Sequence, residues 1–520
     1  MSTFPASKTL SRALQGKKEK GKMTPPSKER EKRVETEPPG LADSAQETGG
    51  APASLLAEGL PGGEAADSVT AEPGPSSGPT PAPPTSLEET GLSREALLGL
   101  LVKTLHLRGG QSGFGISDAL ALPFGLVDDL LLELQGGGLL EVKGAEGPTR
   151  STYRFSLTGK GRERAGDELT ASRYVGPAPV PFSQYVEWIR RQSVETVRIQ
   201  RDQLEAGLGE LVLPEGFLDL LGPAVNSGKS LFLYGDPGNG KTRIAEAVAG
   251  LFGEAFYVPH AVDLDGHIMV LYDPIFHEAL YDHGKEPPSG LQLFRDLPKH
   301  DRRFVRVKRP VAVAGAELEL SQLDLRYDPF SRTYQAPIQL KANGGVLVID
   351  DLGRQRVRPR DLLNRWIVPL EHRLDYLSLE SGKKIAVPFD CLVVFSTNIE
   401  PRELVEEAFL RRIHYKIRVP DPSPDLYDQI FFRCCESQGI RFDPAAPQLI
   451  RREYYETGKA VPRGCHPRDI LSHLRDAAIF KGGETSLSPP LLRQACESYF
   501  VAMGGADTLA ENNSRERLGS

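Results

Sequence analysis

The segment SLFLYGDPGNGKT, which runs from Ser230 to Thr242, decides the predicted fold. Its residues Leu231 to Tyr234 form a short apolar run, which is typical of a parallel strand buried on both faces. The next residues match the pattern GxxxxGK followed by Ser or Thr, and the helix-forming run RIAEAVAGLF comes directly after them. A strand, a glycine-rich loop and a helix in this order predict an α/β protein with a phosphate-binding loop.

This loop has the residues that nucleotide phosphates require. Glycine allows backbone N–H groups to approach phosphate oxygens, and the N-terminus of the following helix adds partial positive charge. The lysine of such a loop reaches the β- and γ-phosphates, and the hydroxyl after it binds Mg²⁺. We therefore expect ATP to be bound by nine consecutive residues, which are Gly235, Asp236, Pro237, Gly238, Asn239, Gly240, Lys241, Thr242 and Arg243.

Two further apolar runs end in polar residues. In GGVLVIDDLGRQ (residues 344–355) the run ends in Asp350 and Asp351, and in CLVVFSTNIEP (residues 391–401) it leads to Asn398. Residues at the carboxyl ends of parallel strands face the crevice in which such sheets bind ligands. Two acids after a strand also occur in simple turns, but downstream of a phosphate loop they favour a catalytic role. We expect Asp350 to hold Mg²⁺ with Thr242. Asp351 is expected to orient the attacking water, and Asn398 to hydrogen-bond that water and the γ-phosphate.

Three arginines are further candidates. Arg411 and Arg412 stand in EAFLRRIHYKI, and Arg468 stands in CHPRDIL at the start of a predicted helix. An arginine lent to a neighbouring subunit's nucleotide stabilises the charge of the transition state. The alternative for any single arginine is an ordinary surface ion pair, and the order of these segments along the chain favours the catalytic interpretation.

Taken together, these segments resemble the AAA+ ATPases, whose motifs follow the same order. Walker A corresponds to residues 235–242, Walker B to residues 346–351, sensor 1 to Asn398, the arginine finger to Arg411 or Arg412, and sensor 2 to Arg468. The resemblance covers roughly residues 195–500. The stretches YVGPAPVPFSQY, LLNRWIVPLEHR and HPRD are also similar to a bacterial group of AAA family ATPases, described as predicted ATPases with chaperone activity and related to MoxR-like ATPases.

This resemblance implies a fold, ligands and partners. It implies a P-loop αβα sandwich over residues 195–420 and a C-terminal helical lid over residues 421–503 that carries Arg468 to the phosphates. The ligands would be ATP and Mg²⁺, and the protein would form a homo-oligomeric ring, commonly of six subunits, that remodels an unknown protein client. The helices predicted for the lid are Leu426–Ser437, Ala446–Tyr454, Asp469–Phe480 and Pro490–Val501.

Two features depart from the family pattern. Walker B usually ends in Asp-Glu, and the shorter side chain of Asp351 implies slower turnover. The separation of 109 residues between Lys241 and Asp350 implies an insert at about residues 260–335. Residues 301–320 of this insert alternate apolar and basic residues and predict a basic-edged β-hairpin. Met269, Leu271 and Tyr272 are candidates to grip a client, although an insert with its own small core explains them equally well.

Residues 91–172 predict a small α+β domain. Helices are expected at 93–107, 117–120 and 124–134, strands at 139–142 and 152–157, and a charged helix from about Thr158. Three helices followed by a hairpin look like a winged helix, a fold that often binds DNA. The third helix has Asp128, Asp129 and Glu133 but no Lys or Arg, which favours protein docking over DNA binding. The Pro-rich residues 173–194 predict a semi-rigid linker.

The first 90 residues predict a disordered tail. Residues 1–34 contain ten Lys or Arg and three Glu, whereas residues 35–92 contain ten Asp or Glu and no Lys or Arg. The second stretch is also rich in Pro and Gly, and such a segment buries too little apolar surface to offset its ordering entropy. The basic block suits nucleic acid or an acidic partner, but neutralisation by the acidic half is favoured. Residues 504–520 predict a second flexible tail.

The overall composition excludes other classes of protein. The 520 residues are 39% apolar and 26% charged, which rules out a wholly disordered chain. No apolar run approaches the ~18 residues of a membrane helix, and the N-terminus has no secretory signal. Five cysteines without metal-ligand spacing favour reduced thiols and a cytoplasmic location. A net charge of −7 gives no overall attraction to nucleic acid.

Three functions fit these observations. The first is a chaperone-like ATPase that remodels a protein client. The second is a DNA-associated regulator or motor that uses residues 91–172. The third is an assembly scaffold that binds ATP and hydrolyses it slowly, which the Asp-Asp ending keeps open.

Overall fold

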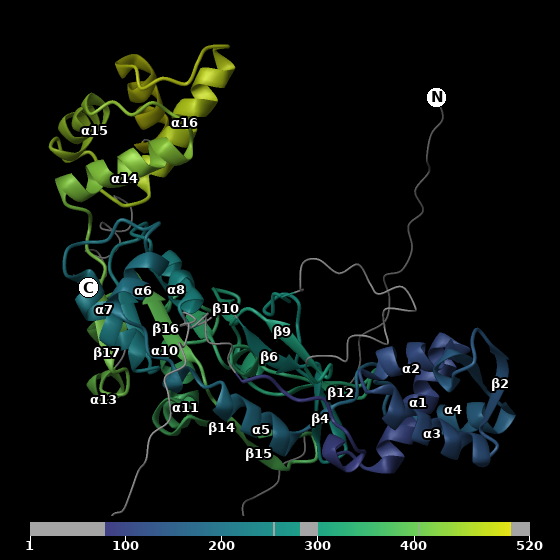
Figure 1. The fold of residues 1–520 in the computed structure, drawn as a ribbon. Coiled ribbons are helices and arrows are strands. Elements are labelled where there is room, and N and C mark those ends of the chain that lie inside the picture. The colour runs from purple at the N-terminus through teal and green to yellow at the C-terminus, as the bar shows by residue number, and fades with distance from the viewer. Residues whose placement is uncertain (1–78, 253–254, 281–299, 405, 501–520) are drawn as a thin grey trace, which may run out of the picture. The chain divides into compact units, whose positions relative to one another are not determined.

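The computed structural model describes residues 79–252, 255–280, 300–404 and 406–500, and Figure 1 shows their helices and strands. The predicted tails lie outside these ranges, apart from residues 79–90. Within the described ranges, no helix combines the length and the apolar character needed to cross a bilayer.

A five-stranded parallel sheet lies at the centre of residues 195–420. Its strand order is β10-β13-β16-β5-β17, and every neighbouring pair is parallel. All residues of β13 and β16 are buried, as their continuous apolar runs predict. The predicted buried strands at 231–234 and 346–349 are therefore confirmed. The strands are β5 (Leu231–Tyr234), β10 (Val311–Ala314), β13 (Val346–Ile349), β16 (Leu392–Thr397) and β17 (Tyr415–Arg418).

Alternate side chains of this sheet pack into two cores, one on each face. Leu231 and Leu233 of β5 belong to one core, together with residues of α6, α7 and α8. Phe232 of the same strand belongs to the other core, together with residues of α10 and Trp366. Helices therefore cover both faces of a parallel sheet, which confirms the α/β class. The helices of this region are α6 (Arg201–Gly207), α7 (Phe217–Asn226), α8 (Lys241–Gly250), α9 (Ile338–Lys341), α10 (Pro359–Arg365), α11 (Ile367–His372), α12 (Pro401–Leu404) and α13 (Glu407–Leu410).

A second sheet has the order β11-β12-β8-β7-β4 and mixes parallel with antiparallel pairs. Met269 and Leu271, predicted to grip a client, are 0% and 2% exposed and pack in its core. The alternative of an insert with its own core describes them correctly, and the grip prediction for these two residues is wrong. The strands are β4 (Val180–Pro181), β7 (Ala261–Leu264), β8 (His267–Val270), β11 (Arg326–Asp328) and β12 (Thr333–Gln335), and a separate hairpin joins β14 (Leu374–Ser378) to β15 (Lys384–Pro388).

The predicted basic hairpin at residues 301–320 is wrong. Strand β9 (Phe304–Val307) pairs antiparallel with β6 (Phe256–Pro259), and β10 leaves to join the central sheet. Pro310 separates the two strands, and β10 forms an edge of the central sheet with Ala312 and Ala314 buried. The predicted insert at 260–335 is therefore interrupted by a strand of the central sheet.

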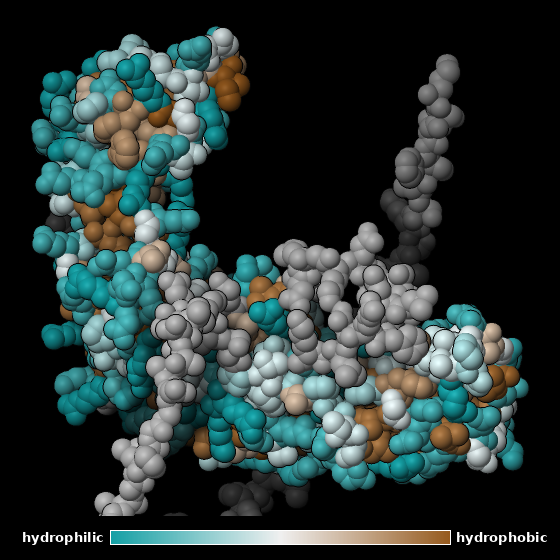
Figure 2. Space-filling view, in the orientation of Figure 1, coloured by the Kyte–Doolittle hydropathy of each residue, from teal (hydrophilic) through white to brown (hydrophobic). Residues whose placement is uncertain are grey.

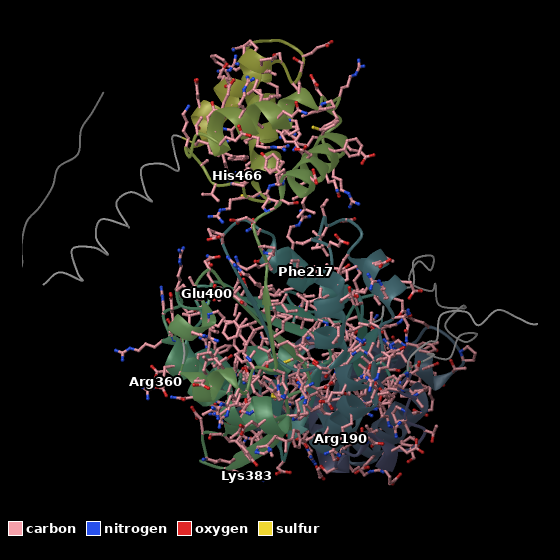
Figure 3. All side chains as sticks on the ribbon, turned by 90° about the vertical axis from the view of Figure 1, so that its left-hand side faces the viewer. Arg190, Phe217, Arg360, Lys383, Glu400 and His466 are labelled. Atoms are coloured by element: carbon pink, nitrogen blue, oxygen red, sulfur yellow. The ribbon has the colours of Figure 1, made fainter. Side chains whose placement is uncertain are left out.

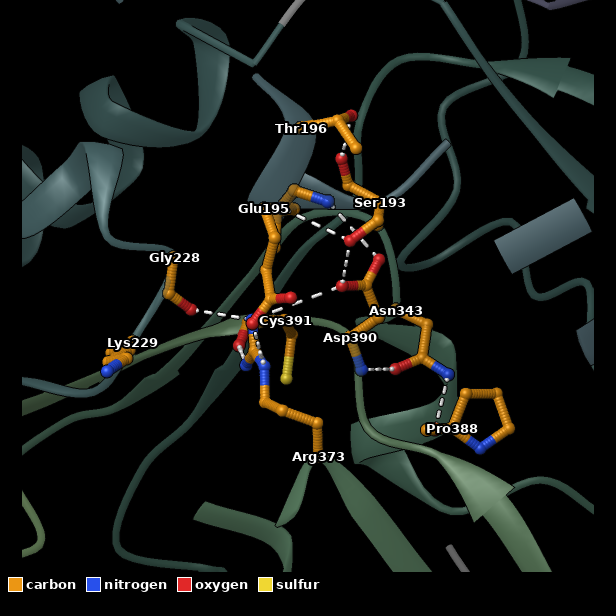
Figure 4. Close-up of polar contacts among 12 residues, drawn as sticks. Ser193, Glu195, Thr196, Gly228, Lys229, Asn343, Arg373, Pro388, Asp390 and Cys391 are labelled. Atoms are coloured by element: carbon orange, nitrogen blue, oxygen red, sulfur yellow. Dashed lines mark hydrogen bonds and ion pairs between the residues drawn. The ribbon is translucent and has the colours of Figure 1, made fainter. Parts of the chain in front are cut away.

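Residues 173–194 do not form the predicted linker. They contain β4 and helix α5 (Phe182–Arg191), and the side chains of Val180 and Tyr185 are fully buried. Pro181, the last residue of β4, is the N-cap residue of α5. Figure 4 shows that Ser193 then contacts the carboxylate of Asp390, to which its hydroxyl donates at 2.8 Å. The proline-rich residues 173–194 therefore form part of the folded structure and do not form a spacer.

Residues 91–172 form helices around a small antiparallel sheet of order β1-β3-β2. Ser93, Ser112 and Thr158 cap the helices that follow them, and the predicted hairpin is confirmed. Residues 79–90 do not belong to the predicted disordered tail, because Thr90 is buried and the backbone N–H of Asp301 donates to the carbonyl of Pro81. The elements are α1 (Arg94–Arg108), β1 (Gln111–Ser112), α2 (Gly113–Leu120), α3 (Phe124–Gly136), β2 (Leu140–Ala145), β3 (Tyr153–Leu157) and α4 (Gly159–Ala171).

The C-terminal bundle, residues 424–500, consists of helices around one apolar core. The four predicted helices are confirmed, although the second runs from an α-helix into a π-helical turn. Buried His466, which Figure 3 labels, opens the third. The elements are α14 (Pro424–Ser437), α15 (Ala445–Ile450), the π-helix at Arg451–Tyr455, α16 (His466–Phe480) and a helix over 489–500.

Candidate nucleotide site

The loop between β5 and α8 has the backbone that its glycines predict. Gly235, Gly238 and Gly240 have φ values of 134°, 85° and 83°, a region that other residues rarely adopt. A Cβ at Gly235 would overlap the carbonyl oxygen of Val419, whereas one at Gly240 would meet no heavy atom of the described residues within 4 Å. In the described part of the chain no side chain caps the N-terminus of α8. The loop therefore has open space beside uncapped N–H groups, which suits an anion.

Lys241 is the central cation of the site. Its ammonium donates to the carbonyls of Gly235 and Asp236, both at 2.9 Å, and to Oδ1 of Asn398 at 2.7 Å. The side chain is 6% exposed. Burial lowers the pKa of Lys241, and the nearby carboxylates of Asp351 and Asp350 act in the opposite direction. A phosphate that reaches this ammonium must therefore replace acceptors that are already in place.

Asp350, directly after β13, pairs with Thr242 of α8. The hydroxyl of Thr242 lies 3.0 and 3.1 Å from the two carboxylate oxygens of Asp350. A hydroxyl and a carboxylate are the hard oxygen ligands that Mg²⁺ prefers. The donor set therefore fits the predicted metal site.

Asp351 and Asn398 complete the group. The amide nitrogen of Asn398 donates to Oδ1 of Asp351 at 2.9 Å, while its oxygen accepts from Lys241. Asp351 has a φ of 51°, a left-handed conformation in which Asp and Asn are enriched over longer side chains. The structure thus brings together five predicted residues, Lys241, Thr242, Asp350, Asp351 and Asn398.

These residues line a cleft of about 1160 Å³. Residues 209–213, which contain the apolar run LVL, line it together with Phe432 of α14 and Arg354. None of the residues named in the preceding sentence was predicted from the sequence. The available signals were an apolar run upstream of the phosphate loop and the arginine in DDLGRQR. Neither signal stands at a fixed distance in the sequence from the phosphate loop.

The predicted arginines divide into two groups. Arg243 and Arg468 line the cleft, and Nε of Arg468 donates to Asp469 at 2.9 Å. Arg411 and Arg412 are not among the lining residues. Arg411 pairs with Glu407 at 3.1 Å, and Arg412 pairs with Glu371 at 2.6 Å. The structure therefore brings Arg468 to the cleft but not Arg411 or Arg412.

One missed arginine contacts the phosphate loop. The guanidinium of Arg463, in the segment before α16, lies 2.7 Å from Oδ2 of Asp236. Its position depends on how the C-terminal bundle meets the loop, which no local pattern encodes.

Comparisons with known proteins assign only part of the chain. Residues 423–498 match the family model described as "Domain of unknown function (DUF8689)". This range falls within the C-terminal bundle. No curated protein matches the chain.

Solved structures give weak similarities. The chain is similar to NtrX from Brucella abortus in complex with ADP, with 12% identity and a TM-score of 0.32 over 56% of this chain and 52% of that one. It is also similar to the RuvB Holliday junction branch migration motor from Thermotoga maritima, with 14% identity and a TM-score of 0.30 over 60% and 73%. The match thus spans about half of NtrX. At these scores neither similarity bears on fold or function.

Proposed function

We propose that the chain is an ATP-hydrolysing protein of the AAA+ type. The proposal rests on one observation. Hydrogen bonds link Lys241 through Asn398 to Asp351. They join the ammonium of the phosphate loop to a carboxylate at the end of a different strand. This is the juxtaposition of a phosphate-binding cation and a water-orienting acid that γ-phosphate hydrolysis requires.

The residues have distinct roles in this mechanism. Lys241 and the N-terminus of α8 bind the phosphates. Thr242 and Asp350 hold Mg²⁺, which neutralises phosphate charge when bound. Asp351 and Asn398 orient the attacking water, and Asp351 accepts its proton. Arg468 adds positive charge from the C-terminal bundle, which acts as a lid.

The apolar part of the cleft suits the nucleotide base. Leu211, Val212 and Leu213 line it together with Phe432. A purine stacked among such side chains gains apolar burial and leaves the triphosphate at the loop. The polar and apolar parts of one cleft therefore match the two parts of ATP.

Arg411 is the better candidate for an arginine supplied to a neighbouring subunit. Its side chain is 77% exposed, whereas that of Arg412 is 30% exposed beside Glu371. Arg411 also lines a second pocket of about 530 Å³, together with Arg402, Lys416 and its ion-pair partner Glu407, so that three cations face one acid. A basic pocket away from the chain's own cleft suits the phosphates of another copy, and supports a homo-oligomeric ring.

The use of the ATP is proposed as remodelling of a protein client. Figure 2 shows apolar residues in several small groups on one face. The acidic side chains of α3 argue against the DNA alternative. Asp128 accepts a hydrogen bond from Nε of Arg150 at 2.7 Å. An arginine that could contact a DNA phosphate is therefore already paired with an acid of α3. This observation favours the protein client over DNA.

Slow hydrolysis in an assembly scaffold is the second candidate. It is favoured by Asp351, whose short side chain already accepts from Asn398. The scaffold predicts nucleotide binding with turnover near background.

Turnover by the purified chain tests the proposal. We expect hydrolysis of Mg·ATP by an oligomer, and a loss of at least about 100-fold in Asp351→Asn. Asp361→Asn, the same change at an exposed acid of α10, serves as the matched control and should retain full turnover. Turnover that survives Asp351→Asn would refute the role of Asp351. Nucleotide binding without turnover by the wild type would support the scaffold instead.

A further inference from the structure

The proposed phosphate-binding loop carries an acid directly before the residues that line the cleft. Asp236 follows Gly235 directly, and its side chain is 44% exposed. A carboxylate close to bound phosphates opposes their binding by Coulomb repulsion, which is strong near a partly buried site. A loop with this residue needs a compensating cation.

Arg463 provides that cation from the C-terminal bundle. One terminal nitrogen of its guanidinium contacts Oδ2 of Asp236 at 2.7 Å and Oδ1 of Asp421 at 2.5 Å. The Arg463 side chain is 19% exposed, so the pair is better shielded from solvent than a surface ion pair. Asp421 lies between β17 and α14, where the central sheet domain meets the bundle.

A second set of contacts holds the same segments together. The amide of Asn239 donates to Asp421 at 2.7 Å and accepts from the backbone N–H of Gly464 at 2.9 Å. A Cβ at Gly238 would overlap the sulfur of Cys465, so the loop and residues 463–465 pack closely. Arg463 is therefore fixed beside Asp236 by its backbone neighbours as well as by charge.

The charge of Arg463 also reaches the phosphate-binding lysine. Burial lowers the pKa of Lys241 most, Asp236 acts to raise it, and Arg463 acts to lower it. Neither Arg463 nor Asp236 is among the residues that line the cleft, whereas Arg468 and Arg354 are. Arg463 is thus placed to act on bound phosphate through Asp236 and not by direct contact.

We propose that Arg463 is a positioning residue that neutralises Asp236 and thereby allows the loop to accept nucleotide phosphates. This inference rests on the proposed nucleotide site. It assigns to the segment before α16 a role distinct from that of Arg468, which faces the nucleotide from the cleft wall.

Binding of a fluorescent ADP derivative with Mg²⁺ to the full chain tests the inference. Arg463→Ala should weaken binding by about tenfold, because Asp236 is left uncompensated. Asp236→Asn should restore it, so that Arg463→Ala/Asp236→Asn binds within about twofold of Asp236→Asn alone. Arg463→Lys, which keeps the charge, should lose less than Arg463→Ala. The matched control is Arg493→Ala, which removes an arginine that pairs with Glu453 elsewhere in the bundle and should leave binding unchanged.

The outcomes separate this inference from the proposed function. Equal binding by Arg463→Ala and the wild type overturns the inference but not the nucleotide site. A loss in Arg463→Ala that Asp236→Asn does not rescue overturns neutralisation of Asp236 as the cause. Thermal unfolding of each variant shows whether a loss reflects folding, and rescue by Asp236→Asn is a result that a purely structural role does not produce. Absence of binding by the wild type and by Asp236→Asn refutes the proposed function itself.

Discussion

Strand β16 has a polar cluster at each end, and the two clusters differ in what surrounds them. After its carboxyl end, Asn398 joins Lys241 to Asp351 beside a cleft of about 1160 Å³. Just before its amino end, Asp390 is 8% exposed and accepts from the Ser193 hydroxyl and the Val194 N–H. Both clusters contain an acid, an amide and a cation, and the residues of the first line the cleft.

The contrast separates a binding site from a structural junction. Figure 4 shows the second cluster, in which Arg373 donates to the carbonyls of Gly228 and Cys391 and Asn343 accepts from the backbone of Asp390. These contacts tie together loops that are distant in the sequence. In the first cluster the contacts of Lys241 would have to exchange if the proposed nucleotide bound there. Polar residues at strand ends therefore indicate function only where the neighbouring space is open.

The same substitution at the two ends of the sheet should have opposite consequences. Asp390→Ala leaves buried donors without an acceptor and should lower the free energy of unfolding by about 2–4 kcal/mol, with little effect on nucleotide affinity of the folded protein. Asp350→Ala should abolish Mg²⁺-dependent turnover and change stability by about 1 kcal/mol or less. Chemical denaturation and turnover, measured on both variants, check this. A large loss of stability in Asp350→Ala, together with normal turnover, would contradict the distinction between a catalytic cluster and a structural cluster.

The two neighbouring arginines offer a finer comparison. Arg411→Ala should reduce turnover by about 100-fold or more, because it removes charge supplied to another subunit's nucleotide. Arg412→Ala removes the pair with Glu371 and should have a smaller effect. Mixing Arg411→Ala subunits with Asp351→Asn subunits should restore part of the turnover, since each provides what the other lacks. Failure of this mixture, or a larger loss in Arg412→Ala, would contradict the assignment.

The smallest expected effect concerns pH. Burial raises the pKa of Asp390 above its ordinary value of 3.8, although Ser193 and Arg373 oppose the shift. The folded state therefore binds this proton more tightly than the unfolded chain. Its stabilising contribution is present at low pH and is lost as pH rises through the raised pKa.

Asp390→Asn removes this titration. The stability of the wild type relative to Asp390→Asn should fall as pH rises through that range, by at most about 1.4 kcal/mol per pH unit. Denaturation at several pH values measures the difference, with Asp361→Asn as the exposed control. A difference that does not change with pH would contradict the account of this cluster.

The sequence was informative wherever one short segment determines both strand and site. The run from Leu231 to Thr242 contains its strand, its loop and the start of its helix, so its structure depends little on distant residues. Asp350 and Asn398 were predictable for the same reason, because each follows a continuous apolar run that ends at the same edge of the sheet.

The remaining features depend on contacts between distant segments. Phe304–Val307 pairs with Phe256–Pro259, about fifty residues upstream, so its basic alternation indicated the wrong partner. Arg463 reaches Asp236 only because the bundle folds back onto the loop. The linker prediction at 173–194 failed because proline is common both in spacers and at the first turn of a helix.

The most direct test of the central claim is equilibrium binding of Mg·ADP to the wild type and to Lys241→Ala, measured by calorimetry. We predict one nucleotide per wild-type chain and a loss of affinity of about 100-fold in Lys241→Ala, because the central cation is removed from the cleft. No binding by the wild type, or equal affinity in Lys241→Ala, would contradict the assignment of this cleft as a nucleotide site.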